Sequence, residues 1–384
     1  MYNDKNLAYL REALAYLTTI QKYFIESDGT FITDTKIKVW ENFPKLRSIL
    51  AAGGVLQIRD ILFLQIYGLD FNQDELQRYK ENFFTKYEDF FTVALLADAN
   101  LKIRKAYHTL DLPLPPPTLI GTLPIGNLNA RVFKSPQQIN IITINSGLIS
   151  FVYSIAKVIA FSYQYVRNEK DLIELSLNDT PPEQLEHFQA LSQDFLYSLD
   201  TYLKHGYVPD SLNDIALYQD SHLMGPIKGL VKSSLLFVIG HEYAHISLAA
   251  SNQQTLQSQY DSAFNFAQNM EIDSDFLGFL LAMYAEERDT TMKPFFRYAG
   301  IEFYLMLCEF LEDILQIKLS ETHPMATDRI TKMRAYGEEL IPDEFDYSMK
   351  LAKRNKTLIY SFWREVKGEL VEEIEEIIRK GFTV

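Results

Sequence analysis

Residues 235–250 read LLFVIGHEYAHISLAA, and this stretch decides both the fold and the chemistry that we expect. Its apolar residues favour a helix, and residues i and i+4 of a helix lie on one face. His241 and His245 can therefore bind one metal ion through their imidazole nitrogens. Glu242 follows the first histidine, where a carboxylate can take a proton from water that the metal activates. A chance match on an amphipathic helix is the alternative interpretation.

An acidic segment downstream offers the third ligand. Glu271 and Asp275 are four residues apart on a predicted helix, so both carboxylates face the same way. A catalytic zinc site takes three protein ligands and keeps a fourth position for water. We therefore expect His241, His245 and Glu271 to bind one Zn²⁺ per chain. Asp275 is expected to accept a hydrogen bond from the free imidazole N–H of His241 and so to fix its tautomer. The alternative is an acidic helix edge in water.

The composition excludes some classes of protein. The 384 residues include 47% hydrophobic residues, 23 Tyr and 26 Phe, so the chain has a large core and is not disordered. The net charge of −14 argues against a nucleic-acid partner. The single cysteine, Cys308, excludes an internal disulfide and is expected to be a buried structural thiol in a reducing compartment, the cytoplasm. The first residues lack the apolar core of a signal peptide, so we do not expect export.

One apolar segment could be either a membrane span or a buried helix. Residues 147–165 read GLISFVYSIAKVIAFSYQY, which is close to the length of a membrane span. Lys157 lies near the centre of the segment, and three serines and a glutamine accompany it. Such polar residues favour a buried core helix over a membrane span. Membrane association is therefore not expected.

Helical spacing of apolar residues dominates the chain, so the expected fold is mainly α with one small β-sheet and an all-helical N-terminal region. A proline segment over 110–117 marks the main boundary. The expected units are 1–112, then 113–341 with a helical insertion around 168–225, then a C-terminal helical extension over 342–384. The predicted helices cover 4–26, 35–52, 72–110, 147–167, 182–206, 226–250, 261–287, 294–317, 324–340 and 343–380, and the predicted strands cover 118–125 and 139–144.

The H-E-x-x-H segment followed by E-x-x-S-D resembles the gluzincin metallopeptidases. Two other segments are similar to the HtpX-like and CaaX-prenyl-protease branch of that group. One is Asn129-Ala130-Arg131 with the strand and Gly-Leu-Ile run at 141–149, and the other is Thr322-His323-Pro324 with Arg329. The resemblance covers about residues 129–330. It implies a zincin-like metallopeptidase fold for the unit 113–341 and a protein or peptide substrate.

The resemblance also implies roles for single residues. His323 is expected to stabilise the negative charge that develops on the scissile carbonyl, and Arg329 to contact the ligand Glu271. Asn129 is expected to lie at the substrate. The alternative for the segment that begins at Thr322 is a helix cap, and a cap would also aim His323.

The strand over 139–144, with Ile141 and Thr143, is a candidate to pair with an extended substrate backbone. About ninety residues separate 149 from the histidine motif, and this insertion can shape or cover the cleft, so the substrate cannot be carried over. The transmembrane helices of that branch are also missing.

The leading interpretation is a zinc-dependent endopeptidase in the cytoplasm, with Glu242 as general base. A catalytically silent zincin-like protein that binds or regulates is one alternative, although the presence of Glu242 argues against it. A membrane-associated protease that uses residues 147–165 as an anchor is the other. The oligomeric state stays open.

Overall fold

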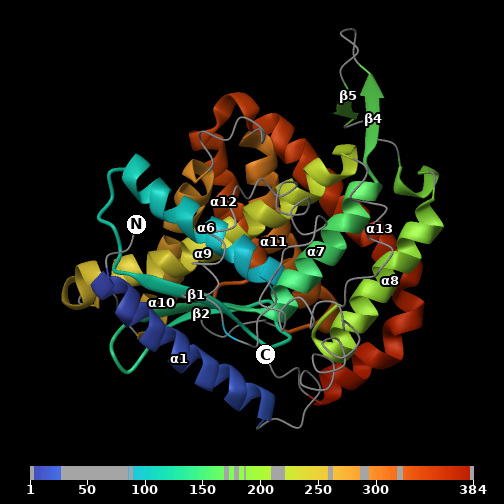
Figure 1. Cartoon of the computed structure of the whole chain (residues 1–384). Coiled ribbons are helices and arrows are strands. Elements are labelled where there is room, and N and C mark those ends of the chain that lie inside the picture. The colour runs from blue at the N-terminus through green and yellow to red at the C-terminus, as the bar shows by residue number, and fades with distance from the viewer. Residues whose placement is uncertain are drawn as a thin grey trace.

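The structure is a computed structural model that describes residues 4–26, 85, 90–167, 173–176, 181–185, 187–208, 221–257, 263–285, 294–317 and 323–380. The predicted helix over 35–52, and the first part of the one over 72–110, lie outside these residues. The described chain is mostly helical and contains one three-stranded sheet (Figure 1). The predicted fold class, mainly α with one small sheet, is confirmed.

The three-stranded sheet has the strand order β1-β3-β2. Strand β1 (Thr118–Leu123) runs parallel to the central strand β3 (Asn140–Asn145), and β2 (Ala130–Lys134) runs antiparallel to it. Strands β1 and β3 are predicted from the sequence, whereas β2 is not. This short strand carries Arg131 and Lys134, both exposed, and charged side chains of this kind protect the edge of a sheet rather than forming a hydrophobic pattern.

The central position of β3 corrects a prediction about the substrate. Ile141 and Thr143 are fully buried, and β3 is paired on one edge with β1 and on the other with β2. A strand with both edges occupied has no backbone groups left for a substrate. The expected substrate contacts of Ile141 and Thr143 are therefore wrong. Strand β2 lies at the edge of the described sheet and contacts the helix of the histidine motif.

Helix α9 (Ser221–Gln257) carries the histidine motif and lies at the centre of the fold (Figure 1). The helices packed against it are α6 (Phe90–Thr109), α7 (Ser146–Phe161), α10 (Ala263–Tyr284) and α11 (Pro294–Leu315). The apolar residues before the motif, from Leu235 to Ile239, are buried in these contacts. Burying such side chains contributes about 1.5–3 kcal/mol each, so the core fixes the helix that presents the histidines.

Helix α7 contains most of the apolar segment over 147–165 and is a core helix, as predicted. Phe151 and Ile155 on this helix are fully buried. The helix ends earlier than predicted, because the next residues form β4 (Gln164–Arg167), which pairs with β5 (Ile173–Ser176) in a ribbon that the sequence analysis does not predict. None of the described helices is long and apolar enough to cross a membrane.

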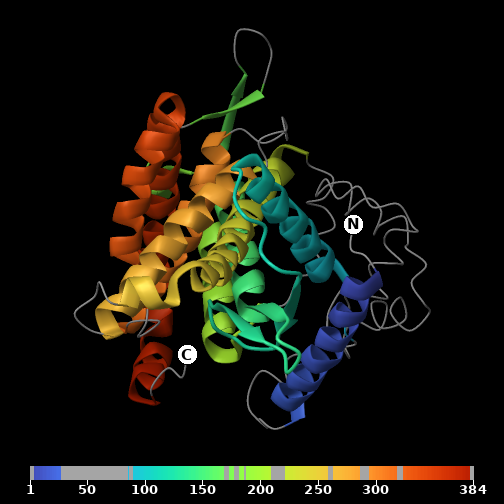
Figure 2. The same cartoon turned by 90° about the vertical axis from the view of Figure 1, so that its left-hand side faces the viewer.

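The N-terminal helices pack directly on the core. Helix α1 (Asp4–Glu26) places Leu10 and Leu17 against the sheet, and Gln21 Nε2 donates to the carbonyl of Thr122 at 2.7 Å. Helix α6 contacts both the sheet and α9. Figure 2 shows α1 and α6 on one side of the molecule and the C-terminal helix on the other. The expected domain boundaries at 112 and 341 stay predictions.

Two tyrosines tie α6 to the motif helix. The hydroxyl of Tyr243, inside the motif, donates to Asn100 Oδ1 at 2.6 Å. The hydroxyl of Tyr107 lies 2.7 Å from Ser247 Oγ. Asn100 and both tyrosines are buried, so these bonds anchor α9 through the face that points away from the site.

The insertion and the C-terminal region complete the fold on the other side. Besides β5, the described part of the insertion contains a 3-10 turn (Pro182–Gln184) and helix α8 (Phe188–His205), which is shorter than the predicted helix over 182–206. Helix α12 (Ala326–Leu340) follows the segment with His323. Helix α13 (Pro342–Lys380) packs on α11 and α8.

Candidate active site

The side chains of His241, His245 and Glu271 point to one spot between α9 and α10. The Nε2 atoms of the two histidines are 3.0 Å apart, and Glu271 Oε2 lies 3.2 Å from the first and 3.5 Å from the second. Ligand atoms placed tetrahedrally at about 2.1 Å from a zinc ion lie about 3.4 Å from one another. The three predicted ligands therefore have the spacing that a zinc ion requires.

The protonation of His241 indicates that this spot needs a cation. His241 Nδ1 lies 2.9 Å from Asp275 Oδ1, and an ionised carboxylate only accepts hydrogen bonds. The proton of a neutral His241 is therefore on Nδ1, and its Nε2 is an acceptor. This Nε2 lies 3.2 Å from Glu271 Oε2, which is also an acceptor when the carboxylate is ionised. Buried acceptors that face each other are costly unless a cation lies between them.

The charges around this spot favour positive charge. Burial lowers the pKa of His241, but Asp275 and Glu271 outweigh it and raise this pKa to about 9. Burial raises the pKa of Glu271, whereas the neighbouring histidines lower it well below its usual range. A metal ion that binds here would displace the proton that the site otherwise holds.

Asp275 organises a buried group of hydrogen bonds behind the ligands. It accepts from His241 Nδ1, as predicted, and it also accepts from Arg329 Nε at 2.8 Å and from a terminal nitrogen of Arg329 at 2.6 Å. The prediction that Arg329 contacts Glu271 is therefore wrong. Glu271 and Asp275 are one helical turn apart, and the guanidinium reaches the second of them.

Ser274 holds the other histidine and was missed as a site residue. Its hydroxyl lies 3.1 Å from His245 Nδ1, so both candidate ligand histidines are oriented through their Nδ1 atoms. The signal was available in the sequence, because Ser274 lies three residues after Glu271 and shares its helix face.

The two helices that carry the ligands touch through glycines. A Cβ atom on Gly240 would lie 2.9 Å from the carbonyl oxygen of Gly278, and one on Gly278 would lie 2.7 Å from the amide nitrogen of His241. Side chains at these two positions would push α9 and α10 apart. The glycines therefore permit the close approach that brings Glu271 to the histidines.

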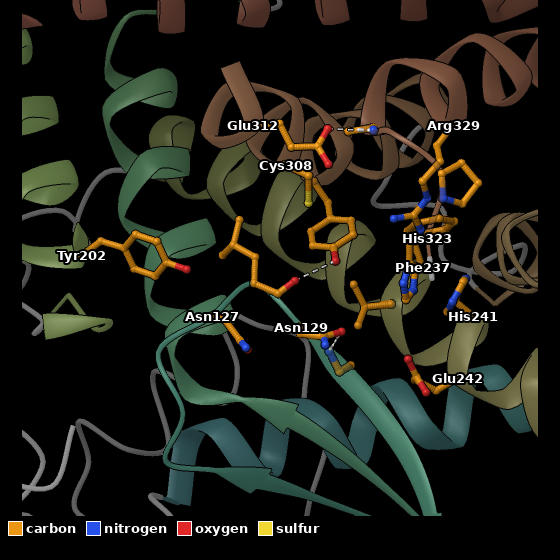
Figure 3. A pocket seen from close by; sticks show the side chains of 16 residues that line it. Asn127, Asn129, Tyr202, Phe237, His241, Glu242, Cys308, Glu312, His323 and Arg329 are labelled. Carbon is orange, nitrogen blue, oxygen red and sulfur yellow. Dashed lines mark hydrogen bonds between the residues drawn. The ribbon is translucent and has the colours of Figure 1, made fainter. Parts of the chain in front are cut away.

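Glu242 and His323 lie in a cleft beside the ligands. Figure 3 shows His241, Glu242 and His323 together at one end of this cleft. His323 Nε2 is 2.9 Å from Glu271 Oε2, and its ring stacks on that of His241 with the centroids 5.7 Å apart. By the spacing of their ligand atoms, all within 4.8 Å of one another, His323, His241 and Glu271 form a group that could hold a metal ion.

Burial sets the protonation of these two side chains. Burial raises the pKa of Glu242 above its ordinary value, although the nearby histidines oppose this change. Burial lowers the pKa of His323, and Glu271 opposes this. The cleft therefore contains a carboxyl group whose proton is held more tightly than in water.

Asn129 lines the cleft, unlike Ile141 and Thr143. It lies just before β2, and its side-chain oxygen accepts from the backbone N–H of Ala130 at 2.9 Å. The structure thus brings this predicted residue to the site from the edge strand. Cys308 also lines the cleft. Burial raises the pKa of its thiol to about 12, in agreement with the predicted structural role.

The comparisons with known proteins assign the family. The family model of peptidase U49 matches residues 142–347, which is more than half of the chain. The chain belongs to the peptidase U49 family. No curated protein and no solved structure matches it. Membership in the peptidase U49 family means that the protein is a peptide hydrolase and that its substrate is a protein or peptide. The matched region begins in β3 and ends in α13, so it includes every ligand candidate.

Proposed function

We propose that this peptidase is a zinc-dependent endopeptidase in which His241, His245 and Glu271 bind one Zn²⁺. The observation that carries the proposal is the convergence of the three ligand atoms, which lie 3.0–3.5 Å from one another at one largely buried spot between α9 and α10. Imidazole nitrogens with one carboxylate oxygen are a donor set that suits zinc.

The chain's own residues account for the chemistry. Zinc, when bound, supplies a Lewis acid that lowers the pKa of water and polarises the peptide carbonyl. Glu242 takes the proton of the attacking water and delivers it to the departing amine. His323 donates a hydrogen bond to the oxygen on which negative charge develops. Asp275 and Ser274 hold the two imidazoles in the orientation that leaves both Nε2 atoms for the metal.

The edge strand β2 takes the role first given to β3. It lies at the edge of the described sheet, its first residue lines the cleft, and it contacts α9. An extended substrate backbone can add to such an edge through main-chain hydrogen bonds, with little dependence on sequence. The mechanism thus keeps the expected kind of substrate contact and moves it to the neighbouring strand.

The resemblance to gluzincins, in their HtpX-like and CaaX-prenyl-protease branch, supports this mechanism. The Arg329–Asp275 pair departs from the contact that the branch implies, and the insertion with α8 is an addition to it. We therefore carry over the catalytic roles that the branch implies, but not its substrates. The expected compartment is the cytoplasm, and recovery of the protein in the membrane pellet of detergent-free lysate would contradict this.

The substitution Glu242→Gln tests the proposal. It removes the base without removing a ligand, so peptide cleavage should fall by about 10²–10⁴-fold while one zinc per chain stays bound. Metal content is measured on the purified protein, and cleavage is measured on a peptide library. His241→Ala is the matched variant that should lose the zinc as well.

The outcomes separate the alternatives. Cleavage that survives Glu242→Gln would refute the mechanism. A wild-type protein that binds zinc but cleaves no peptide would favour a silent protein that binds or regulates.

A further inference from the structure

The first turn of helix α12 is capped by a side chain from another helix. The N-cap residue of α12, Met325, makes no side-chain capping bond. The backbone N–H of Ala326, the first residue of the helix, instead donates to Glu312 Oε2 of α11 at 2.9 Å. Both residues line the cleft, and Figure 3 shows the bond between them. Glu312 therefore supplies from α11 the acceptor that Met325 does not.

Burial makes this bond important. Glu312 is 7% exposed and Ala326 is 2% exposed, so water has little access to either group. The N–H groups at the start of a helix have no partner within the helix, and leaving one unpaired in a buried place costs about 1–3 kcal/mol. The positive end of the helix dipole favours a carboxylate at the same place. The start of α12 is therefore held where the carboxylate of Glu312 lies.

Two side chains that reach the candidate metal site depend on where α12 begins. His323 lies three residues before Ala326, and its Nε2 is 2.9 Å from Glu271 Oε2. Arg329 lies on the first turn of α12, and its guanidinium donates to Asp275 at 2.6 and 2.8 Å. The start of one helix thus carries two contacts to the site.

His323 needs the support of the cap more than Arg329 does. Arg329 lies inside the helix and is bound twice to a buried carboxylate. His323 lies before the helix, separated from its first residue by two others, and its side chain is 22% exposed. Its direction is therefore set by the point at which α12 begins. A displacement of about 1 Å at a catalytic group lowers the rate by about 10²-fold.

We propose that Glu312 is a positioning residue for the peptidase reaction, and that its carboxylate places His323 at the scissile carbonyl by capping α12. The proposal rests on the proposed function, because it explains what holds the residue that stabilises the developing negative charge. In this assignment Glu312 does not touch the reacting atoms. It acts through Ala326 and the two residues between Ala326 and His323.

The experiment compares Glu312→Ala, which removes the acceptor, with Glu312→Gln, whose side-chain oxygen can still accept from Ala326. Zinc-loaded proteins are assayed for kcat and KM on one cleaved peptide, well below the thermal midpoint of every variant. We expect Glu312→Ala to lower kcat at least about tenfold with little change in KM, because His323 acts mainly in the transition state. Glu312→Gln should keep most of kcat, and both variants should keep one zinc per chain.

A double variant separates positioning from a general loss of stability. His323→Ala removes the group itself, and kcat should fall by about 10²–10³-fold. Adding Glu312→Ala to His323→Ala should cause no further loss of kcat, because the effect of the cap passes through His323. Arg334→Met is the control on the same helix, since it breaks the 2.6 Å ion pair with Glu302 and should lower the thermal midpoint without changing kcat.

Amide hydrogen exchange gives a readout that does not depend on cleavage. The N–H of Ala326 should exchange slowly in the wild type and in Glu312→Gln, and much faster in Glu312→Ala. The amides in the middle of α12 should exchange alike in all three proteins, which would show that the helix remains folded.

The outcomes distinguish the role of Glu312 from the proposed function. Equal losses of kcat in Glu312→Ala and Glu312→Gln would mean that the charge of Glu312 acts directly, and would overturn the proposal. A further loss of kcat in the double variant, or fast exchange of Ala326 in the wild type, would also overturn it, while the peptidase mechanism stands. Wild-type kcat in His323→Ala would instead refute the role of His323 in the proposed function, and the role of Glu312 falls with it.

Discussion

The substitution Asp275→Asn tests the buried group behind the ligands. Asp275, Arg329 and His241 are each less than 10% exposed, so water cannot replace a lost partner. Asn keeps the shape and an acceptor for His241, but it removes the charge that faces two nitrogens of Arg329 at 2.8 and 2.6 Å. Leaving one partner of a buried ion pair without the other costs about 3–5 kcal/mol. The free energy of unfolding of the metal-free protein should fall by this amount.

Zinc affinity should change for a separate reason. The carboxylate increases the basicity of His241 through the 2.9 Å contact, and removing such a partner lowers metal affinity by about 10–100-fold. Adding Arg329→Met to Asp275→Asn removes the unpaired charge, so the double variant should recover much of the stability. Its zinc affinity should stay low, because His241 still lacks the carboxylate.

The assays are urea unfolding of metal-free protein and competition for zinc with a chromogenic chelator. Arg334→Met is the control, since it breaks the ion pair with Glu302 at 2.6 Å and should lower stability without changing zinc affinity. The reasoning is refuted if Asp275→Asn costs less than about 1 kcal/mol. It is also refuted if the double variant binds zinc as tightly as the wild type.

Three shorter predictions follow from other features. Gly206→Ala, at φ 62° with its new Cβ 2.5 Å from Cα of Gly126, should cost more than about 1 kcal/mol in urea unfolding. Gly368→Ala, in α13 with nothing within 4 Å, should instead gain about 0.5–1 kcal/mol, and equal effects would contradict the packing argument. The raised pKa of Cys308, about 12, means that the folded chain binds this proton more tightly than the unfolded chain. Its contribution to stability is therefore present below pH 9 and is lost as the pH rises toward 12, and iodoacetamide at pH 8 should label the thiol only after unfolding. Removal of zinc by a chelator should abolish cleavage and lower the thermal midpoint, and Zn²⁺ but not Mg²⁺ should restore both.

Local patterns predicted what depends on local spacing. The helix of the histidine motif and the i, i+4 pair Glu271 and Asp275 were read from the 3.6-residue period, and their contacts with His241 are present in the structure. The predicted boundaries of the helices over 147–167 and 182–206 were less accurate. Helix α7 ends before Ser162 and the aromatic and β-branched residues that follow it. The hydrophobic pattern from which the helix was predicted continues beyond this point.

Features that depend on tertiary contacts could not be predicted from the sequence. Strand β2 has five residues with charges at Arg131 and Lys134, and only its pairing with β3 defines it. That pairing also made β3 the central strand and removed it from the substrate. Arg329 could reach either of two carboxylates one turn apart, and packing selected Asp275. Glu312 is one of several acidic residues on α11, and no local pattern marks it as the cap of α12.

The hydrogen bonds from α6 to α9 come from residues that precede the segment matched by the family model. The family match begins at residue 142, inside β3, yet Asn100 and Tyr107 fasten the helix that carries both histidines. Strands β1 and β2 also precede the match. The matched segment therefore lacks contacts that hold the histidine helix in place, and it is not by itself a complete folding unit. Residues 142–347 alone would carry the candidate ligands without α6, β1 and β2, the elements before the match that pack against the sheet and the motif helix.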